Sequence, residues 1–291
     1  MAVQREGKLI ICPTPLGNLG DMTQRTLDVL ARADVVCCED TRVTGKLLRA
    51  FDISRPLERL DEAKISTSAQ HIVERVLAGQ VIAYCSDAGM PGVSDPGLRL
   101  IDAAYEQGAS VEVLPGASAV TLAYVASGFS SPSFYFGGFF PRKAAEQLRC
   151  LENLKNLDAA LIFYESPRRI VAALERVAHV YPYRQVAVCR ELTKVHEEVL
   201  RGPIRDVYKE LKDRELAGGI KGEIAFVIDA PNEEEAQQTH QSTLQDAQAL
   251  LEQMRNEGTL TKKDMVKQLQ QRYGLSRNDA YELVHSSGQK A

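Results

Sequence analysis

The chain has 291 residues, of which 44% are hydrophobic and 25% are charged, and its formal net charge is −4. This length exceeds what one hydrophobic core usually supports, so we expect two principal domains and a small appendage. The composition is that of a folded globular protein and excludes a disordered or collagen-like chain. The negative net charge excludes a globally basic surface, so any nucleic acid must bind to a local basic patch.

The cysteines, the histidines and the N-terminal residues indicate a protein of a reducing compartment that has no metal site and no membrane span. The six cysteines mostly end apolar runs and form no C-x-x-C pair, so we expect reduced thiols in the core and no zinc or redox site. The five histidines have no ligand spacing, so we expect no metal. Residues 1–7 are polar, and no apolar run approaches the roughly 20 residues of a membrane span. The expected location is the cytoplasm.

Residues 1–126 are predicted to form one α/β domain. Short apolar runs alternate there with segments of helical period, which is the pattern of βαβ units. The predicted strands are 9–12, 35–38, 81–85 and 111–114, and the predicted helices are 22–32, 67–78, 97–107 and 117–126. Because polar residues rarely interrupt the strand runs, we expect a largely parallel sheet with helices on both faces.

A second α/β domain is predicted over residues 127–231. Ser, Gly, Pro and aromatic residues are concentrated at 127–141, as expected of a crossover between domains. The predicted strands that follow are 159–164, 185–190 and 223–229, and the predicted helices are 143–154, 168–179 and 204–213.

The C-terminal part is predicted to be a linker followed by a small helical module. Residues 232–241 are acidic and rich in Gln, which indicates a solvated linker. Within 242–291, helical spacing occurs at 244–253, 262–273 and 278–285. Over 262–277, five Lys and Arg residues against one Asp give a charge of +5 − 1 = +4.

Two interpretations of this basic module stay open. It has the size of a helix-turn-helix unit and would grip RNA, with Lys262, Lys263 and Arg277 as contacts. Alternatively, it is a solvated helical cap. The sequence favours neither.

The predicted ligand site lies at the carboxyl ends of the first-domain strands. The first strand runs into the turn-rich segment 13–21, which contains neither G-x-G-x-x-G nor a P-loop, so a dinucleotide or ATP phosphate loop is excluded. The third strand ends in 86–97, a segment dense in Gly, Pro and Asp. Connecting a strand to a helix takes only about 2–6 residues. A loop this long and rich in glycine favours close approach of the backbone to a ligand.

Two carboxylates are the only charges in the segment 86–97. We expect Asp95 to cap the helix that follows, which leaves Asp87 to face a cationic group such as an amino-acid ammonium. The fourth strand ends in the small residues 115–119. Because open α/β sheets place ligands at the carboxyl ends of their strands, these loops are expected to converge on one crevice.

Eight ordered blocks of this sequence resemble the tetrapyrrole-methylase-like (class III) methyltransferases, and specifically the bacterial 16S ribosomal RNA cytidine-2′-O-methyltransferase family. The blocks are 13–21, 38–42, 86–91 with 95–97, 114–116, 139–143, 163–169, 190–194 and 221–223. The chain departs from the family pattern at 58–62, at Met90 and at 117–118. The resemblance implies two α/β domains with S-adenosyl-L-methionine in the cleft between them, and a homodimer.

The resemblance also implies roles for individual residues. The methionine end of the cofactor would be held by Pro13, Asp87, Met90, Val93, Ser94 and Ala117. The adenosine end would be lined by Tyr164, Leu192, Gly222 and Ile224. The implied product is a 2′-O-methylcytidine in the 16S rRNA of the small ribosomal subunit.

Methyl transfer from a sulfonium is an in-line displacement, so the acceptor oxygen must be aligned about 3 Å behind the methyl carbon. A ribose hydroxyl is poorly acidic, and a group that takes or stabilises its proton would add about 10²–10⁴-fold. Asp40, Glu62 and Lys143 are the candidates, although a helix N-cap explains Asp40 equally well. Arg142 follows two phenylalanines, a pattern that suits base stacking with phosphate contact or, alternatively, core packing.

Three functions are therefore weighed. Methylation of a cytidine ribose in 16S rRNA is favoured. The same fold acting on a tetrapyrrole or another small molecule is the second, and would have no need of the basic module. The third is a binding protein that holds RNA or cofactor without chemistry.

Overall fold

The computed structural model describes residues 6–257 and 260–286. The chain divides into two compact units, Met1–Ala230 and Pro231–Ala291. Within the described residues, no helix is both long and apolar enough to cross a membrane.

The first sheet of the larger unit is parallel throughout and has the order β3-β2-β4-β1-β5. Its strands are β1 (Lys8–Ile11), β2 (Val35–Cys38), β3 (Leu57–Arg59), β4 (Val81–Cys85) and β5 (Val111–Val113). Its helices are α1 (Gln24–Arg32), α2 (Thr41–Ala50), α3 (Glu62–Leu77) and α4 (Gly97–Glu106), with a short 3-10 helix η1 at Leu19–Asp21. The predicted parallel sheet is confirmed. The strand β3 was not predicted, and α2 was predicted only through the alternative that Asp40 caps a helix.

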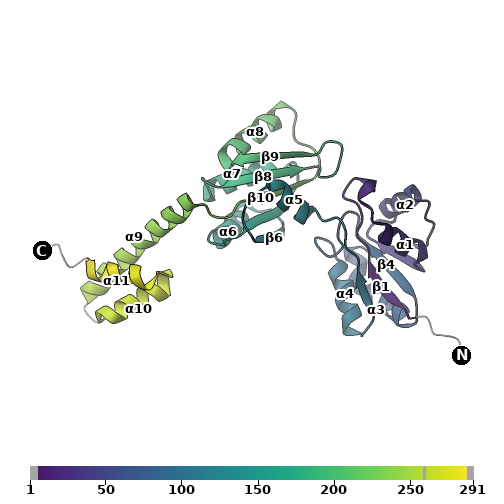
Figure 1. Cartoon of the computed structure of the whole chain (residues 1–291), viewed down its shortest axis with the longest axis horizontal. Helices are drawn as coiled ribbons and strands as arrows, with labels where there is room; N and C mark the ends of the chain where they lie inside the picture. The colour runs from purple at the N-terminus through teal and green to yellow at the C-terminus, as the bar shows by residue number, and fades with distance from the viewer. Residues whose placement is uncertain (1–5, 258–259, 287–291) are drawn as a thin grey trace. The chain divides into compact units, whose positions relative to one another are not determined.

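Successive side chains of each strand in the first sheet point to opposite faces of the sheet, because a strand has a two-residue period. Leu9 and Ile11 pack with the residues of α3 and α4, whereas Ile10 packs with those of α1 and α2. Figure 1 shows these two pairs of helices on opposite sides of β1 and β4. This double covering explains why the strand sequences are almost continuously apolar.

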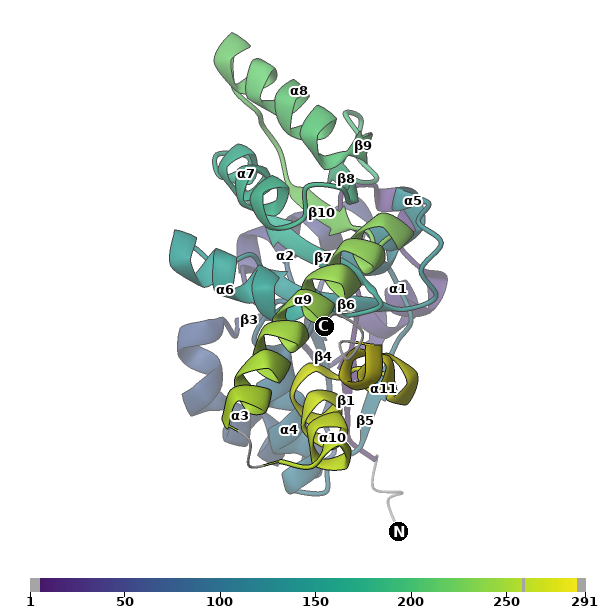
Figure 2. The same cartoon turned by 90° about the vertical axis from the view of Figure 1, so that its left-hand side faces the viewer.

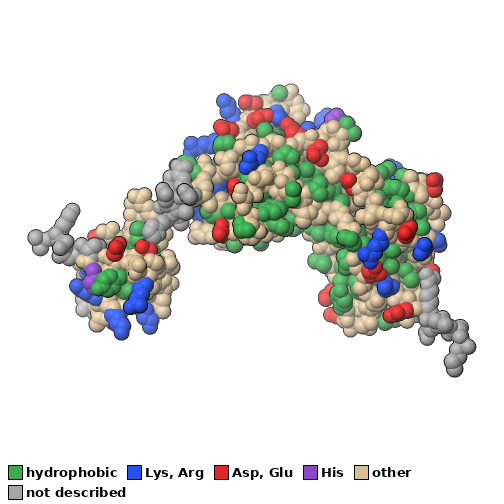
Figure 3. Space-filling view, in the orientation of Figure 1, with side chains coloured by type: hydrophobic (Ala, Val, Ile, Leu, Met, Phe, Trp, Pro, Cys, Tyr) green, Lys and Arg blue, Asp and Glu red, His purple; other side chains and the backbone are tan. Residues whose placement is uncertain are grey.

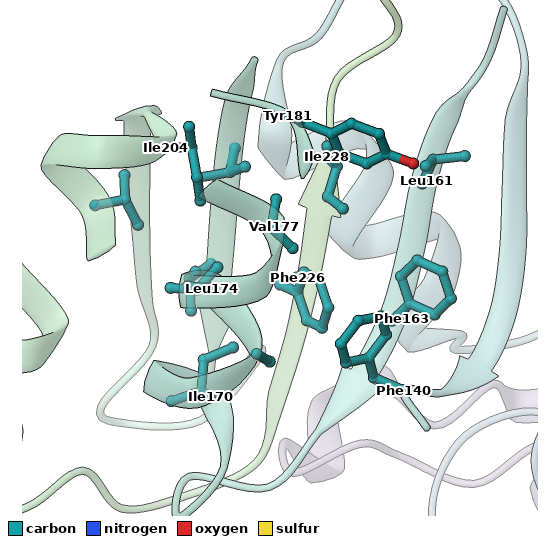
Figure 4. Close-up of a cluster of buried hydrophobic side chains, with 14 of the residues drawn as sticks. Phe140, Leu161, Phe163, Ile170, Leu174, Val177, Tyr181, Ile204, Phe226 and Ile228 are labelled. Carbon is teal, nitrogen blue, oxygen red and sulfur yellow. The ribbon is translucent and has the colours of Figure 1, made fainter. Parts of the chain in front are cut away.

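The second sheet has the order β6-β7-β10-β8-β9 and is mostly antiparallel, with only β6 and β7 parallel to each other. Its strands are β6 (Phe134–Phe139), β7 (Ala160–Glu165), β8 (Gln185–Arg190), β9 (Glu198–Pro203) and β10 (Ile224–Ile228). The helices α6 (Ala144–Leu154), α7 (Ile170–Val180) and α8 (Ile204–Ala217) cover one face. Figure 4 shows Phe140, Phe163 and Phe226 close together in that core.

Helix α5 (Ala119–Ser127) covers the other face of the second sheet. The predicted first domain, 1–126, includes this segment, but Val120 and Ala123 pack with residues of β7, β8 and β10. The apolar period that predicted the helix carries no information about which sheet it covers.

The smaller unit consists of α9 (Glu233–Glu257), α10 (Lys262–Tyr273) and α11 (Arg277–Ser286), whose buried residues form one cluster. Figure 2 shows α10 and α11 beside the C-terminal part of α9. Thr261 caps α10, and Gly274 ends it in a left-handed conformation with φ 65°. The expected linker 232–241 is not a separate segment, because residues 233–241 form the first turns of α9. Glu and Gln are good helix formers, so their polarity does not exclude a helix.

Candidate cofactor site

The loops that follow β1 and β4 are joined by a pair of backbone hydrogen bonds. The N–H of Thr14 donates to the carbonyl of Gly89, and the N–H of Gly89 donates to the carbonyl of Thr14, both at 3.0 Å. Gly89 has φ +79°, and a Cβ there would be 2.9 Å from Leu16 Cδ2. Glycine is therefore needed at position 89 for two reasons. It adopts the left-handed conformation readily, and the absence of a Cβ lets the two loops lie against each other.

Asp95 holds the loop 86–97 against the start of α4. Its Oδ1 accepts hydrogen bonds from the N–H groups of Gly92 at 2.9 Å and Gly97 at 2.8 Å. Gly97 is the first residue of α4, so Asp95 supplies the acceptor that we expected from a cap, although Pro96 occupies the N-cap position. Burial raises the pKa of the Asp95 carboxyl.

Glu39 and Asp87 link the loops that follow β2 and β4. The N–H of Asp87 donates to Glu39 Oε1 at 3.0 Å, and the N–H of Asp40 donates to Asp87 Oδ1 at 3.1 Å. Burial is the largest cause that raises the pKa of both the Glu39 and the Asp87 carboxyl. Glu39 was missed in the sequence, although its place directly after a buried strand was a usable signal.

Two adjoining cavities border these loops, and the larger is lined mostly by residues of the second sheet and its loops. The smaller, of about 200 Å³, is lined by Leu16, Glu39, Ser86, Asp87, Ala88, Gly89, Met90, Val93, Ser94, Asp95, Ser118, Ala119, Phe139 and Tyr164. The larger, of about 410 Å³, is lined by Leu16, Ala88, Ala119, Phe139, Tyr164, Glu165, Ser166, Pro167, Cys189, Leu192, Gly222, Glu223, Ile224 and Ala225. Their shared lining residues make them parts of one site, of a size suited to a small molecule.

The structure brings eight of the ten predicted cofactor residues to these cavities. Those assigned to the methionine end, Asp87, Met90, Val93 and Ser94, line the smaller cavity. Those assigned to the adenosine end, Tyr164, Leu192, Gly222 and Ile224, line the larger one. The other two residues lie beside the loops that form the site. Pro13 is buried against Gly116, where an added Cβ would be 2.5 Å from Pro13 Cβ. The carbonyl oxygen of Ala117 would be 3.5 Å from a Cβ added to Gly89.

Strained backbone shapes the far end of the larger cavity. Glu191 and Thr193 have φ of 53° and 68°, and Gly222 has φ +100°. A Cβ on Gly222 would be 2.5 Å from Glu191 Cγ. Residues that hold such conformations are concentrated at ligand sites. Burial raises the pKa of the nearby Tyr164 to about 12, so its hydroxyl stays protonated at neutral pH.

None of the three predicted catalytic residues is among the lining residues of either cavity. Asp40 is the N-cap of α2, which confirms the alternative explanation, and hydrogen bonds from Arg42 hold the pKa of its carboxyl well below the usual range. Glu62 pairs with Arg99 at 2.9 Å. Lys143 pairs with Glu146 at 3.1 Å, and its side chain is 80% exposed. Their catalytic roles stay predictions.

The predicted RNA contacts are exposed cations. Arg142 lies in the larger unit, and Lys262, Lys263 and Arg277 lie in the smaller one. Figure 3 shows Lys and Arg side chains on the visible face of the smaller unit. In the described ranges, no group of three or more His, Cys, Asp or Glu side chains is placed to hold a metal ion.

Comparisons with known proteins place these features in a family. Residues 8–208 match the family model described as Tetrapyrrole (Corrin/Porphyrin) Methylases. The chain is 36% identical over 281 residues to the protein named Ribosomal RNA small subunit methyltransferase I of Halalkalibacterium halodurans, covering 96% of this chain and 95% of the relative. It is 39% identical over 235 residues to the protein of the same name from Bacillus subtilis, covering 81% and 79%.

Solved structures share the fold at low sequence identity. The uroporphyrin-III C-methyl transferase of Thermus thermophilus, complexed with S-adenyl homocysteine, aligns with a TM-score of 0.54 at 14% identity over 77% of this chain and 97% of that one. A diphthine synthase aligns with a TM-score of 0.59 at 15% identity over 76% and 90%. These matches agree with the two sheets and their helices.

Proposed function

The chain belongs to the tetrapyrrole (corrin/porphyrin) methylase family, and from this premise we propose that it methylates ribosomal RNA of the small subunit. It is a methyltransferase that uses S-adenosyl-L-methionine. The observation that carries the choice of acceptor is its similarity to proteins named for the small subunit, which for the Halalkalibacterium halodurans protein extends over 96% of the chain.

The residues present fit this cofactor. S-adenosyl-L-methionine supplies a methyl group on a cationic sulfonium. The smaller cavity is lined by Glu39, Asp87 and Asp95, and none of its described lining residues is Lys, Arg or His. Asp95 accepts hydrogen bonds from backbone N–H groups on both carboxylate oxygens. Glu39 and Asp87 each accept one on a single oxygen, so these two carboxylates are the ones that would face a cation. In the larger cavity, the apolar side chains of Leu192 and Ile224 suit an adenosine.

The finer assignments are part of the same proposal. The acceptor is the ribose 2′-hydroxyl of a cytidine in 16S rRNA, and the enzyme acts as a homodimer in the cytoplasm. Pro13 and Ala117 support the methionine end by shaping its loops. Arg142, Lys262, Lys263 and Arg277 bind RNA phosphates, because exposed Lys and Arg supply most contacts to a nucleic acid backbone.

Positioning is the main task of the protein in this reaction. For the proton of the acceptor hydroxyl, Asp40, Glu62 and Lys143 remain the candidates. Asp40 is the weakest base of the three, because Arg42 engages both of its carboxylate oxygens. Lys143 is the most available, because its ion-pair partner, Glu146, is also exposed and the pair can open at little cost.

The test is methyl transfer from radiolabelled cofactor to small subunits that lack the modification. We expect one labelled 2′-O-methylcytidine in 16S rRNA after nuclease digestion. Label on a tetrapyrrole and none on RNA would support the small-molecule alternative instead. Cofactor binding without transfer to either acceptor would support the binding-protein alternative.

A further inference from the structure

Phe139 is an exposed aromatic ring at the rim of the cofactor site. The residue is 63% exposed, yet it lines both the smaller and the larger cavity. The next residue, Phe140, is 1% exposed and points into the core with Phe163 and Phe226 (Figure 4). Core packing therefore explains Phe140 and leaves Phe139 unexplained.

A bulge in the edge strand β6 sets the position of this ring. The pairing of β6 with β7 shifts between Phe136 and Phe139, so that three steps along β6 match two along β7. Gly138 has φ +70°, and a Cβ on Gly137 would be 2.2 Å from Phe163 Cε1. Bulges of this kind re-aim side chains beside active sites. Here both glycines are needed for the backbone to pass Phe163 and turn.

Tyr164 supports the ring from the side of the cavities. The centroids of the Phe139 and Tyr164 rings are 5.6 Å apart at 70°, an edge-to-face contact. Tyr164 lines both cavities as well. Phe139 thus contacts a cofactor-site residue, and much of its surface is left open to solvent. A large apolar surface held open at the entrance of a site is suited to a flat partner.

We propose that Phe139 is the stacking platform for the acceptor nucleobase of the RNA substrate. This inference rests on the proposed function and names the residue that positions the nucleotide. Base stacking on an aromatic ring contributes about 1–3 kcal/mol per base. Arg142 and Lys143 follow within four residues and are both exposed, so the same segment offers cations to the flanking phosphates. A stacked base fixes the attached ribose at the entrance, where its hydroxyl must be aligned.

The first test compares Phe139→Ala with Phe139→Trp in methyl transfer to small subunits. We expect Phe139→Ala to raise KM for the subunit about 5- to 150-fold, the range that corresponds to one stacked base, and Phe139→Trp to restore it. The dissociation constant of S-adenosyl-L-methionine, measured by calorimetry, should rise far less than KM, because most of the ring's surface is open to solvent. Tyr135→Ala is the matched control, since Tyr135 is exposed on the same strand and is not among the lining residues.

Two results would overturn the proposal. An unchanged KM for Phe139→Ala means that no base stacks there. A loss of cofactor affinity as large as the loss in KM means that the ring covers the adenosine and not the acceptor.

The second test does not depend on methyl transfer. The chain contains no tryptophan, so Phe139→Trp creates a single fluorescent reporter. Protein-free 16S rRNA should quench its emission in the presence of S-adenosylhomocysteine and leave a Tyr135→Trp control unquenched. If both variants are quenched equally, or if neither is quenched, stacking at position 139 is contradicted. This result is independent of whether small subunits accept a methyl group, so it separates failure of the inference from failure of the proposed function.

Discussion

The aliphatic part of Lys194 lies directly against Gly17, and a Cβ on Gly17 would be 2.3 Å from Lys194 Cγ. The Nζ of the same lysine donates to Glu191 Oε1 and Glu223 Oε2, both at 2.9 Å. The loop after β1 is thus packed against the strained segment beside the larger cavity. Leu16, which precedes Gly17, and Leu192, two residues before Lys194, both line that cavity.

Gly17→Ala is therefore expected to weaken cofactor binding. The added methyl displaces Lys194 at its Cγ, close to the backbone, and overpacking of this kind costs about 1–3 kcal/mol. We expect a rise of at least about fivefold in the dissociation constant of S-adenosyl-L-methionine by calorimetry. Gly20→Ala in the same loop is the control, since its nearest neighbour, Asn18 Oδ1, lies 3.2 Å away on a side chain that can move. Equal effects of the two variants would contradict this role.

Asp87→Asn tests the charge of the smaller cavity. The amide keeps the shape of the side chain and can still accept from the N–H of Asp40, but it has no charge to offer a cation. A charged hydrogen bond contributes about 1.5–3 kcal/mol, so we expect cofactor affinity to fall about 10- to 150-fold. Asp102→Asn, an exposed carboxylate on α4, should leave the affinity unchanged. An unaltered affinity in Asp87→Asn would remove this residue from the cofactor site.

Cofactor binding should also depend on pH. Burial raises the pKa values of Glu39 and Asp87 in the free protein, whereas a bound cation favours their ionised forms and lowers those pKa values. Affinity should therefore increase as the pH rises through the raised pKa values, with protons released on binding, and level off once both groups are ionised. Calorimetry in buffers of different ionisation enthalpy measures this release. Glu39→Gln should reduce the release in weakly acidic buffer, and an undiminished release would exclude Glu39 as its source.

Gly45→Ala is expected to stabilise the fold without affecting the site. Gly45 lies inside α2, its φ is not positive, and a Cβ would be 3.4 Å from Leu57 Cδ1, an ordinary contact. Replacing glycine by alanine inside a helix adds about 0.5–1 kcal/mol. Denaturant unfolding should show an increase of this size in the free energy of unfolding, with unchanged affinity for the cofactor. A decrease would show that Leu57 has no room for the methyl group.

The sequence predicted the elements that have strong apolar periods and the loop that carries the most Gly, Pro and Asp. Asp87 could be singled out because its loop is too long for a connection, and the structure places it in the smaller cavity. Glu39 was not singled out. Its place after a buried strand indicates only that it lies near the strand ends, and its pairing depends on a hydrogen bond from the N–H of Asp87, 48 positions away. Contacts at such separation leave no local pattern.

Other differences have local causes. The strand β6 was not predicted because its glycines, 137 and 138, are poor strand formers, and they are present for the bulge. The acidic, Gln-rich composition of 232–241 indicates a linker, but the same residue types are good helix formers, so composition does not separate the two. The pairing of Asp40 with Arg42 could not be inferred from the block 38–42, because a carboxylate directly after a strand suits catalysis and helix capping equally well.

The most direct test of the central claim is a mass-spectrometric map of 2′-O-methyl nucleotides in 16S rRNA from cells with and without this protein. Cells that carry Asp87→Asn in place of the normal protein provide the matched control. We predict that a single 2′-O-methylcytidine is lost without the protein, is restored by the normal chain, and is restored at most weakly by the variant. Identical maps in the presence and absence of the protein would contradict its assignment as an rRNA methyltransferase.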